Sequence, residues 1–240
     1  MRVLEYEANP AVAEALRLAE SAWETGDNQD VVREESTIYG YTRRIVDLIV
    51  VLGILPFALI GISVIAIVVR LDSPGPAIFK QKRVGQYGKL FTFYKFRTMW
   101  LEARERYPEM YAYSYTPEEV QTMRFKEVLD PRVTRAGFWL RRLSVDELPN
   151  LLNVLRGDMT LVGPRPEIPE MTPYYTREQM AKFAVKPGVT GLAQASGRGL
   201  LGFQDTIARD LQYVRNRSLL FDLKIIARTF IVVVLRRGAY

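Results

Sequence analysis

The longest hydrophobic stretch of the chain runs from Ile45 to Val69, and residues 48–69 carry no charge. Its 25 residues exceed the roughly 20 apolar residues that a helix needs to cross the hydrocarbon core of a bilayer. Pro56 lies near the middle, where a proline removes one backbone hydrogen bond and clashes with the preceding turn. We therefore predict a membrane helix that is kinked or broken at Pro56.

Basic residues flank both ends of this segment. Arg43 and Arg44 precede it, and Arg70, Lys80 and Lys82 follow it. Because cytoplasmic flanks are enriched in Lys and Arg, both ends are expected on the cytoplasmic side. A proline-broken re-entrant helix over residues 41–75 satisfies both observations. A single crossing with a proline kink stays open as an alternative, since membrane helices tolerate proline.

The regions on either side show shorter amphipathic patterns. Residues 10–25 have helical spacing, with Val12, Leu16 and Ala19 on one face, and we expect residues 1–40 to form a peripheral acidic arm. Residues 77–97 alternate around a Gly-rich turn and predict a β-hairpin. Because alternate side chains of a strand lie on the same face, four residues of the second strand are expected on one face. These are Phe91, Phe93, Lys95 and Arg97.

Three later stretches are helical in pattern. Residues 100–125 are polar and interrupted by Pro108, whereas residues 133–143 combine basic residues with Phe138 and Trp139, a composition typical of a helix in the membrane interface. Residues 219–235 suit an interfacial or core helix. The predicted fold is therefore α+β and predominantly helical, a monotopic membrane protein with interfacial amphipathic helices, a small β-hairpin and a domain over residues 76–240 at the membrane face.

Charge is distributed unevenly along the chain. Three basic and nine acidic residues leave residues 1–40 with a net charge of −6, so a formal total of +6 assigns +12 to the remaining 200 residues. A basic body suits anionic lipid or a phosphorylated substrate. Without a recognisable binding motif, nucleic acid is not an expected partner.

The chain contains neither cysteine nor histidine. Disulfides and thiolate metal sites are therefore excluded, and so is the usual general base. Any catalysis must use Asp, Glu, Lys, Arg or Tyr. The acidic start lacks the basic and apolar regions of a signal peptide.

The strongest candidate for chemistry is the adjacent pair Asp146 and Glu147, within the run Ser144–Asn150. Ser144 and Glu147 match a capping box, which is a purely structural interpretation. A helix N-terminus also favours an ionised Asp146, and an ionised carboxylate is a competent nucleophile toward phosphorus.

Two loops strengthen the catalytic interpretation. A short apolar strand leads to Gly163–Pro166, where Arg165 between two prolines could grip a phosphate with its planar fork. The loop from Lys186 through Gly199 is rich in glycine, which lets backbone N–H groups approach a diphosphate.

With these residues in view, the chain resembles the bacterial sugar transferase family, the monotopic phosphoglycosyl transferases of the polyprenyl-phosphate hexose-1-phosphate type. The matching stretches are residues 89–99, 143–166 and 185–198. Together with the membrane segment, the resemblance runs from about residue 41 to the C-terminus and does not cover the acidic arm.

The resemblance implies a two-step exchange at the cytoplasmic face of the bacterial inner membrane, in the first membrane step of glycoconjugate or exopolysaccharide synthesis. Asp146 attacks a UDP-sugar and releases UMP, and a polyprenyl phosphate, undecaprenyl phosphate in bacteria, takes up the sugar-phosphate. The family uses Mg²⁺, which Asp146 also contacts, and Glu147 is the second carboxylate of the dyad. Four arginines match basic positions for phosphate or nucleotide, and Pro56 matches the proline of the re-entrant helix; the arginines are Arg97, Arg141, Arg165 and Arg198.

Two departures from the family pattern stand out. Asn150 replaces a frequent Gln, which we expect to be a mild change at a helix surface, and Gln194 lacks the aromatic residue that often precedes it. Two other functions stay open: direct attack by the lipid phosphate with Asp146 only holding the metal, and a non-catalytic membrane scaffold. The sugar, the pathway and the oligomeric state, a homo-oligomer included, cannot be read from the sequence.

Overall fold

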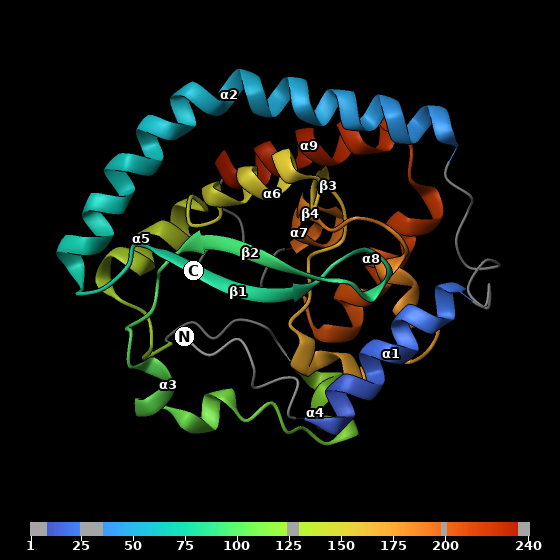
Figure 1. Cartoon of the computed structure of the whole chain (residues 1–240), viewed down its shortest axis with the longest axis horizontal. Coiled ribbons are helices and arrows are strands. Elements are labelled where there is room, and N and C mark those ends of the chain that lie inside the picture. The colour runs from blue at the N-terminus through green and yellow to red at the C-terminus, as the bar shows by residue number, and fades with distance from the viewer. Residues whose placement is uncertain (1–8, 25–35, 124–129, 198–200, 235–240) are drawn as a thin grey trace.

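The computed structural model describes residues 9–24, 36–123, 130–197 and 201–234. Within these ranges the fold is mostly helical, with two small two-stranded sheets (Figure 1). The longer helices are α1 (Pro10–Glu24), α2 (Thr37–Asp72), α5 (Arg135–Leu143), α8 (Phe203–Asn216) and α9 (Leu219–Val234).

The remaining elements are short. The short α-helices are α3 (Ala103–Arg106), α4 (Pro117–Thr122), α6 (Leu151–Arg156) and α7 (Leu192–Gly197). The 3-10 turns are η1 (Gln86–Gly88), η2 (Pro108–Tyr111), η3 (Leu148–Asn150), η4 (Pro169–Tyr174) and η5 (Gln179–Ala184). The polar stretch predicted as one interrupted helix over residues 100–125 is thus divided into α3, η2 and α4.

The predicted hairpin is confirmed. Strands β1 (Ile78–Val84) and β2 (Leu90–Phe96) pair antiparallel, with Phe79 opposite Lys95. Phe91 and Phe93 are buried in a core shared with α2 and α6. Because side chains alternate along a strand, Lys95 points to the same side as these two rings.

The second sheet pairs β3 (Thr160–Val162) with β4 (Gly188–Thr190) in parallel. The sequence predicts β3, whereas β4 falls in a region interpreted only as a glycine-rich loop. Glycine is required here by close backbone approach: a Cβ on Gly163 would lie 2.5 Å from the Lys186 carbonyl oxygen. The sheet therefore joins the two loops that the sequence proposes for phosphate.

Helix α1 is part of the core. The predicted amphipathic helix is present, and Val12, Ala15 and Ala19 are buried. Ala15 and Ala19 share a core cluster with residues of η4, η5 and α8. The prediction of a peripheral arm is therefore wrong for this helix, because its apolar face packs on the body.

Helix α2 is one continuous helix that contains Pro56, and Figure 1 shows it bending about midway. The predicted break at Pro56 is thus a bend, as expected when a proline removes one helical hydrogen bond. At the C-terminal end, Val69 packs with Phe96 and Leu140. Both ends of α2 therefore contact the same body.

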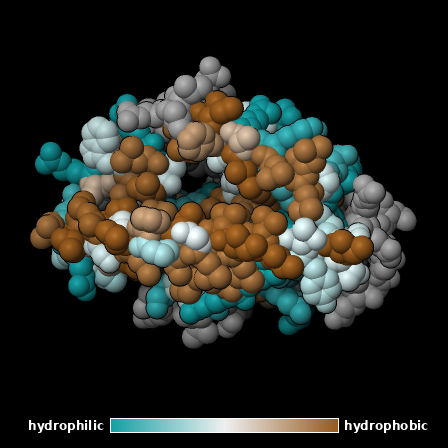
Figure 2. Space-filling view, turned by 90° about the horizontal axis from the view of Figure 1, so that it is seen from above, coloured by the Kyte–Doolittle hydropathy of each residue, from teal (hydrophilic) through white to brown (hydrophobic). Residues whose placement is uncertain are grey.

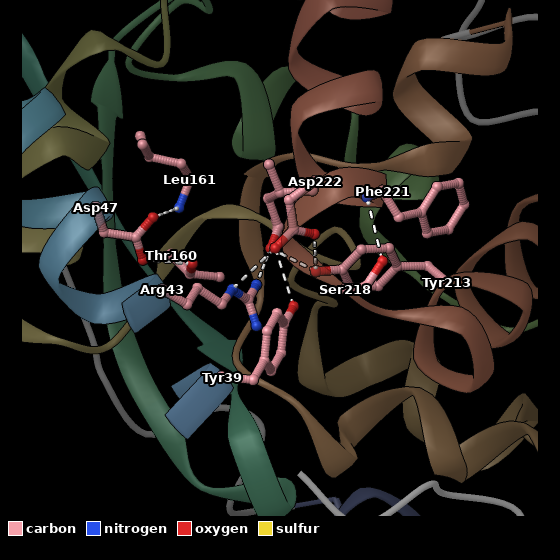
Figure 3. A network of polar contacts seen from close by, with 10 residues as sticks. Tyr39, Arg43, Asp47, Thr160, Leu161, Tyr213, Ser218, Phe221 and Asp222 are labelled. Atoms are coloured by element: carbon pink, nitrogen blue, oxygen red, sulfur yellow. Dashed lines mark hydrogen bonds and ion pairs between the residues drawn. The ribbon is translucent and has the colours of Figure 1, made fainter. Parts of the chain in front are cut away.

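A buried polar network holds the N-terminal part of α2 (Figure 3). Arg43 donates to the Val162 carbonyl oxygen and lies 3.6 Å from the carboxylate of Asp222 in α9. Asp47 accepts from the hydroxyl of Thr160 at 2.6 Å and from the Leu161 N–H at 3.2 Å. Asp222 also accepts from Tyr39 of α2 and Tyr213 of α8. Charges that would be costly inside a bilayer are thus paired with the body.

The side of the molecule that carries α2 is strongly hydrophobic, and Figure 2 shows this residue type gathered in a band across it. Within the described residues, α2 alone is long and apolar enough to cross a membrane. Exposed hydrophobic residues also lie on α5 and α9, including Trp139 and Phe230. The exposed large residues of α2 include Ile45, Ile49, Leu52, Ile54, Phe57, Leu59, Ile60, Val64, Ile67, Val68 and Leu71. An apolar surface of this extent indicates contact with membrane.

Candidate functional site

The Asp146–Glu147 pair lies in a turn between α5 and α6. Ser144 ends α5 in the left-handed conformation (φ 58°), so it is a C-cap residue and the predicted capping box is wrong. A 3-10 turn follows the pair and has Pro149 in its first positions, where proline is tolerated. The Asp146 carbonyl oxygen accepts from the Phe96 N–H at 2.8 Å, which fixes the pair beside the end of β2.

The two carboxylates have different partners. Arg165 donates from Nη2 to Glu147 Oε1 at 2.6 Å. In the part of the chain that the structure describes, the Asp146 carboxylate makes neither a hydrogen bond nor an ion pair. Glu147 is therefore held in place, whereas Asp146 is free to react with a ligand.

The pKa values of the two carboxylates are also shifted in opposite directions. Burial and the neighbouring charge of Glu147 raise the pKa of Asp146. Burial is the largest single influence on Glu147 and opposes its charge, but Arg165, Lys95 and Arg83 together hold the pKa of Glu147 below its ordinary value. The expectation that a helix N-terminus favours an ionised Asp146 is thus contradicted, because α6 begins only at Leu151.

Two cations that the sequence analysis did not select surround the pair. Lys95 acts electrostatically on both carboxylates, and burial together with Arg83 and Arg141 lowers its pKa to about 8. Arg83 donates from Nη1 to the Pro166 carbonyl oxygen at 3.3 Å. The strand alternation that placed Lys95 with Phe91 and Phe93 was the available signal for Lys95. The contact of Arg83 with residue 166 has no local signal.

Of the four arginines predicted to bind phosphate or nucleotide, two lie near the acidic pair. Arg165 contacts the pair directly, and Arg141 lies near enough for its charge to lower the pKa of Asp146. Arg141 also donates to Thr98 Oγ1 at 3.0 Å and lies 3.7 Å from Asp130 Oδ2. Arg198 lies outside the described residues.

Arg97 has a structural position, which corrects its predicted role as a phosphate ligand. Its guanidinium donates to the carbonyl oxygens of Ser73 at 2.7 Å and Pro76 at 2.8 Å. It is 4% exposed. Arg97 is the first residue after β2, and its side chain is directed to the end of α2 rather than to the acidic pair.

Asn150 is also different from its prediction. It is fully buried, not on a helix surface. Among the described residues, neither its Nδ2 nor its Oδ1 atom has a hydrogen-bond partner, and its backbone N–H donates to the Glu147 carbonyl oxygen at 2.9 Å. Buried side-chain amides are usually hydrogen-bonded, so this one is an exception.

The acidic pair fits a magnesium ion by its donor chemistry. Among the described residues, no group of three or more acidic side chains could hold a metal alone. Mg²⁺ usually binds one or two carboxylates and takes its remaining ligands from water and substrate phosphates. Asp146 and Glu147 are therefore a suitable partial set for Mg²⁺ that arrives with a diphosphate.

The whole arrangement is a half-buried carboxylate pair with cations from three separate segments, and comparison with known proteins gives it a context. Residues 38–236 match the profile of the family described as bacterial sugar transferase. The chain belongs to the bacterial sugar transferase family.

Members of this sugar transferase family with curated names are similar over most of the chain. It is 36% identical over 228 residues to the galactosyl transferase CpsE of Streptococcus agalactiae serotype III, covering 92% of this chain and 49% of that protein. It is 45% identical over 174 residues to the UDP-glucose:undecaprenyl-phosphate glucose-1-phosphate transferase of Caulobacter vibrioides, with coverages of 68% and 59%.

A third relative is the undecaprenyl-phosphate galactose phosphotransferase of Salmonella typhimurium. It is 42% identical over 166 residues, which are 69% of this chain and 35% of that protein. The chain therefore spans only part of the length of these three sugar transferases.

Proposed function

We propose that this protein transfers a sugar-1-phosphate from a UDP-sugar to a polyprenyl phosphate such as undecaprenyl phosphate, and releases UMP. The observation that carries this proposal is that the two carboxylates of the acidic pair have different partners. Glu147 is paired with Arg165, whereas Asp146 has no side-chain partner in the described chain and faces the charges of Lys95 and Arg141. Three relatives whose names specify sugar or sugar-phosphate transfer support the same reaction.

In the first step, an Asp146 carboxylate oxygen attacks the β-phosphorus of the UDP-sugar. The bond from this phosphorus to the bridging oxygen breaks, and UMP leaves with the electron pair. Lys95, Arg141 and Arg165 offset the phosphate charge during attack, as fixed cations do in phosphoryl transfer.

In the second step, a phosphate oxygen of the polyprenyl phosphate attacks the same phosphorus. The bond to Asp146 breaks, the carboxylate is restored, and a polyprenyl diphosphosugar forms. Glu147 contributes by holding Arg165 at 2.6 Å and by its negative charge beside Asp146. Bound Mg²⁺, with Asp146 and Glu147 as its protein ligands, would neutralise diphosphate charge and stabilise the leaving group.

The same proposal includes a re-entrant position of α2 with the site at the cytoplasmic face. Its support is that both ends of the bent helix contact one body, which an ordinary straight crossing would not allow. Arg43 and Arg44 lie at one end and Arg70 at the other, so the positive-inside tendency favours the cytoplasmic side for both.

The test is a burst of UMP from purified protein given a UDP-sugar and Mg²⁺ without lipid acceptor. Wild-type protein is expected to release UMP in an amount matching the enzyme, and a panel of UDP-sugars identifies the donor. Asp146→Asn is expected to lose the burst while its thermal unfolding midpoint stays near that of wild type. Lys224→Gln, on the exposed part of α9, is the matched control and keeps the burst.

A second candidate mechanism is direct attack by the lipid phosphate, with Asp146 only a metal ligand. The Asp146 carboxylate, which has no side-chain partner in the described chain, is equally available to a metal ion. Turnover without any trapped covalent phosphosugar, or a burst that persists in Asp146→Asn, would select this mechanism. Undiminished transfer by both Asp146→Asn and Glu147→Gln would instead indicate a scaffold.

A further inference from the structure

A cavity that contains several charged residues lies at the N-terminal part of α2, and neither Asp146 nor Glu147 lines it. Its volume is about 410 Å³. The lining residues from α2 and its start are Ser36, Thr37, Gly40, Tyr41, Arg43, Arg44 and Asp47, and those from the body are Gln86, Met159, Thr160 and Lys186. None of these residues belongs to the set proposed to act at the acidic pair, although Lys186 begins the glycine-rich loop that the sequence analysis connects with a diphosphate.

Two cations in this cavity lack acidic partners. Arg44 donates to the carbonyl oxygens of Val154 and Leu155, which orient its guanidinium without neutralising it. The Nζ atom of Lys186 and Nη2 of Arg44 both lie 3.7 Å from the position that a Cβ on Gly157 would occupy. Across the ranges that the structure describes, no carboxylate lies within ion-pair distance of either side chain.

The other charged residues of the cavity are already engaged. Arg43 pairs with Asp222. Asp47 lines the cavity, but both of its carboxylate oxygens accept hydrogen bonds from β3. Against the three cations of the lining stand two carboxylates, Asp47 in the lining and Asp222 beside Arg43, so one positive charge remains in excess.

A hydrocarbon surface begins at the same place. Tyr41 lines the cavity and is 71% exposed. Ile45 and Ile49 follow at a spacing of four residues on α2 and are 56% and 66% exposed. Residues four apart lie on one face of a helix, so an apolar stripe extends from the cationic cavity along the membrane helix.

We propose that this cavity binds the phosphate of an anionic phospholipid from the surrounding bilayer, with the acyl chains along Ile45 and Ile49. Arg44 and Lys186 would contact the headgroup phosphate, to which guanidinium and ammonium groups donate strong charge-assisted bonds. Inorganic phosphate or a free nucleotide would use these cations but would leave the apolar stripe without a partner. The site does not depend on the sugar-transfer reaction, only on the location of α2 in the membrane.

The experiment uses the full chain in nanodiscs containing equal amounts of phosphatidylcholine and phosphatidylglycerol. Native mass spectrometry then counts the lipids that stay bound after release from the disc. Wild-type protein is expected to retain phosphatidylglycerol in preference to phosphatidylcholine. Lys186→Gln is expected to reduce that preference about fivefold, the ratio that corresponds to roughly 1 kcal/mol for a cation near an anionic membrane surface.

Matched variants distinguish a specific site from general attraction. Arg44→Gln removes the second cation and is expected to act like Lys186→Gln, whereas Lys224→Gln on α9 leaves the preference unchanged. Equal retention of both lipids by wild type, or full preference in a folded Lys186→Gln protein, overturns the proposal. Loss of bound phosphatidylglycerol on addition of inorganic phosphate overturns the lipid as occupant and assigns the cavity to free phosphate.

Discussion

Asp146 and Glu147 are neighbours in the chain, but their surroundings give them opposite properties. Arg165 keeps Glu147 ionised, whereas burial beside Glu147 favours the proton on Asp146. Carboxylates whose environments move their pKa values apart can take different roles in one reaction. Arg165 is thus the strongest cationic influence on Glu147, whereas Lys95 precedes it for Asp146.

Replacing Arg165 is expected to move the acid limb of the pH–rate profile. Arg165 lowers the pKa of both carboxylates, so Arg165→Gln raises both values, and protonation then inhibits at higher pH. We expect the limb to move upward by about one to two pH units, measured as UMP release across pH. A lower rate with an unmoved limb would show that Arg165 acts only on the substrate.

Lys95 leads to a prediction about stability. Its pKa falls from 10.5 to about 8 in the folded protein, so between these values the unfolded chain binds more protons. The free energy of unfolding therefore rises with pH across this window, by up to about 3 kcal/mol from this group. Lys95→Met removes that rise, and thermal unfolding midpoints from pH 8 to 10.5 measure it.

The control for Lys95 is Lys80→Met, on the exposed side of the same hairpin. It is expected to keep the rise seen in wild type. Parallel pH curves for wild type and Lys95→Met would contradict the assigned burial of Lys95.

At the scale of elements, a buried charge network joins η5, α8 and the loop after Arg165. Lys182 Nζ lies 3.1 Å from Asp210 Oδ2 and 3.6 Å from Glu167 Oε2, and the Tyr175 hydroxyl donates to Glu167 at 2.6 Å. Lys182 is 2% exposed and Asp210 is fully buried. Because Glu167 follows Arg165 by two residues, this network fixes the loop that carries Arg165.

Breaking this network on one side is expected to be costly. Lys182→Met leaves Asp210 buried without its cation, which typically costs about 3–5 kcal/mol, whereas Asp210→Leu leaves Lys182 with Glu167 at 3.6 Å and is expected to cost less. The double variant Lys182→Met with Asp210→Leu removes both charges and is expected to lose less than the sum. Unfolding midpoints of the four proteins form the cycle, and additive losses would argue against direct coupling.

At the scale of the whole molecule, the apolar face and the two anchored ends of α2 define one orientation. In the proposed orientation, the hydrophobic face in Figure 2 lies in the membrane, while the acidic pair lies between the hairpin and α6, which pack beneath α2. Such a shallow insertion would place the site near the headgroup level, where the water-soluble nucleotide sugar and the lipid phosphate of the proposed reaction can meet.

This orientation predicts a labelling pattern. The chain has no cysteine, so Ser36→Cys and Leu101→Cys each introduce a single thiol at an exposed position before and after α2. Both are expected to resist a membrane-impermeant maleimide in intact cells and to react after lysis. Labelling of either thiol in intact cells would indicate a crossing of the membrane instead.

Local patterns in the sequence predict those elements whose cause is local. The hairpin follows from alternation around the turn before β2, and α1 follows from the spacing of Val12, Leu16 and Ala19. Local spacing makes Ser144 look like the N-cap of a helix. The turn in which it lies is instead fixed by the hydrogen bond from the Phe96 N–H to the Asp146 carbonyl oxygen, between residues 50 positions apart in the chain. The burial of Asn150 and the direction of Arg97 likewise depend on which segments pack together.

The candidate site shows the same limit. Asp146, Glu147 and Arg165 lie within one motif, so the sequence predicts them together. Lys95 and Arg83 come from the hairpin, and only the packing of β2 against the turn that holds the pair brings them near. Strand alternation gives the face on which Lys95 lies, but it does not indicate the contact with the pair, because that contact depends on long-range packing.

The contacts that hold α2 also set an order of events during synthesis. Arg43 and Asp47 find partners 119 and 113 residues later, and Tyr39 bonds to Asp222 across 183 residues. At about 5–20 residues per second, the ribosome needs roughly 10–40 s to supply that last partner. Helix α2 is therefore synthesised long before the residues that form these hydrogen bonds with it. Nascent chains stalled ahead of Asp222 are expected to lose α2 to trypsin at Arg43 faster than completed chains, and equal rates would refute this order.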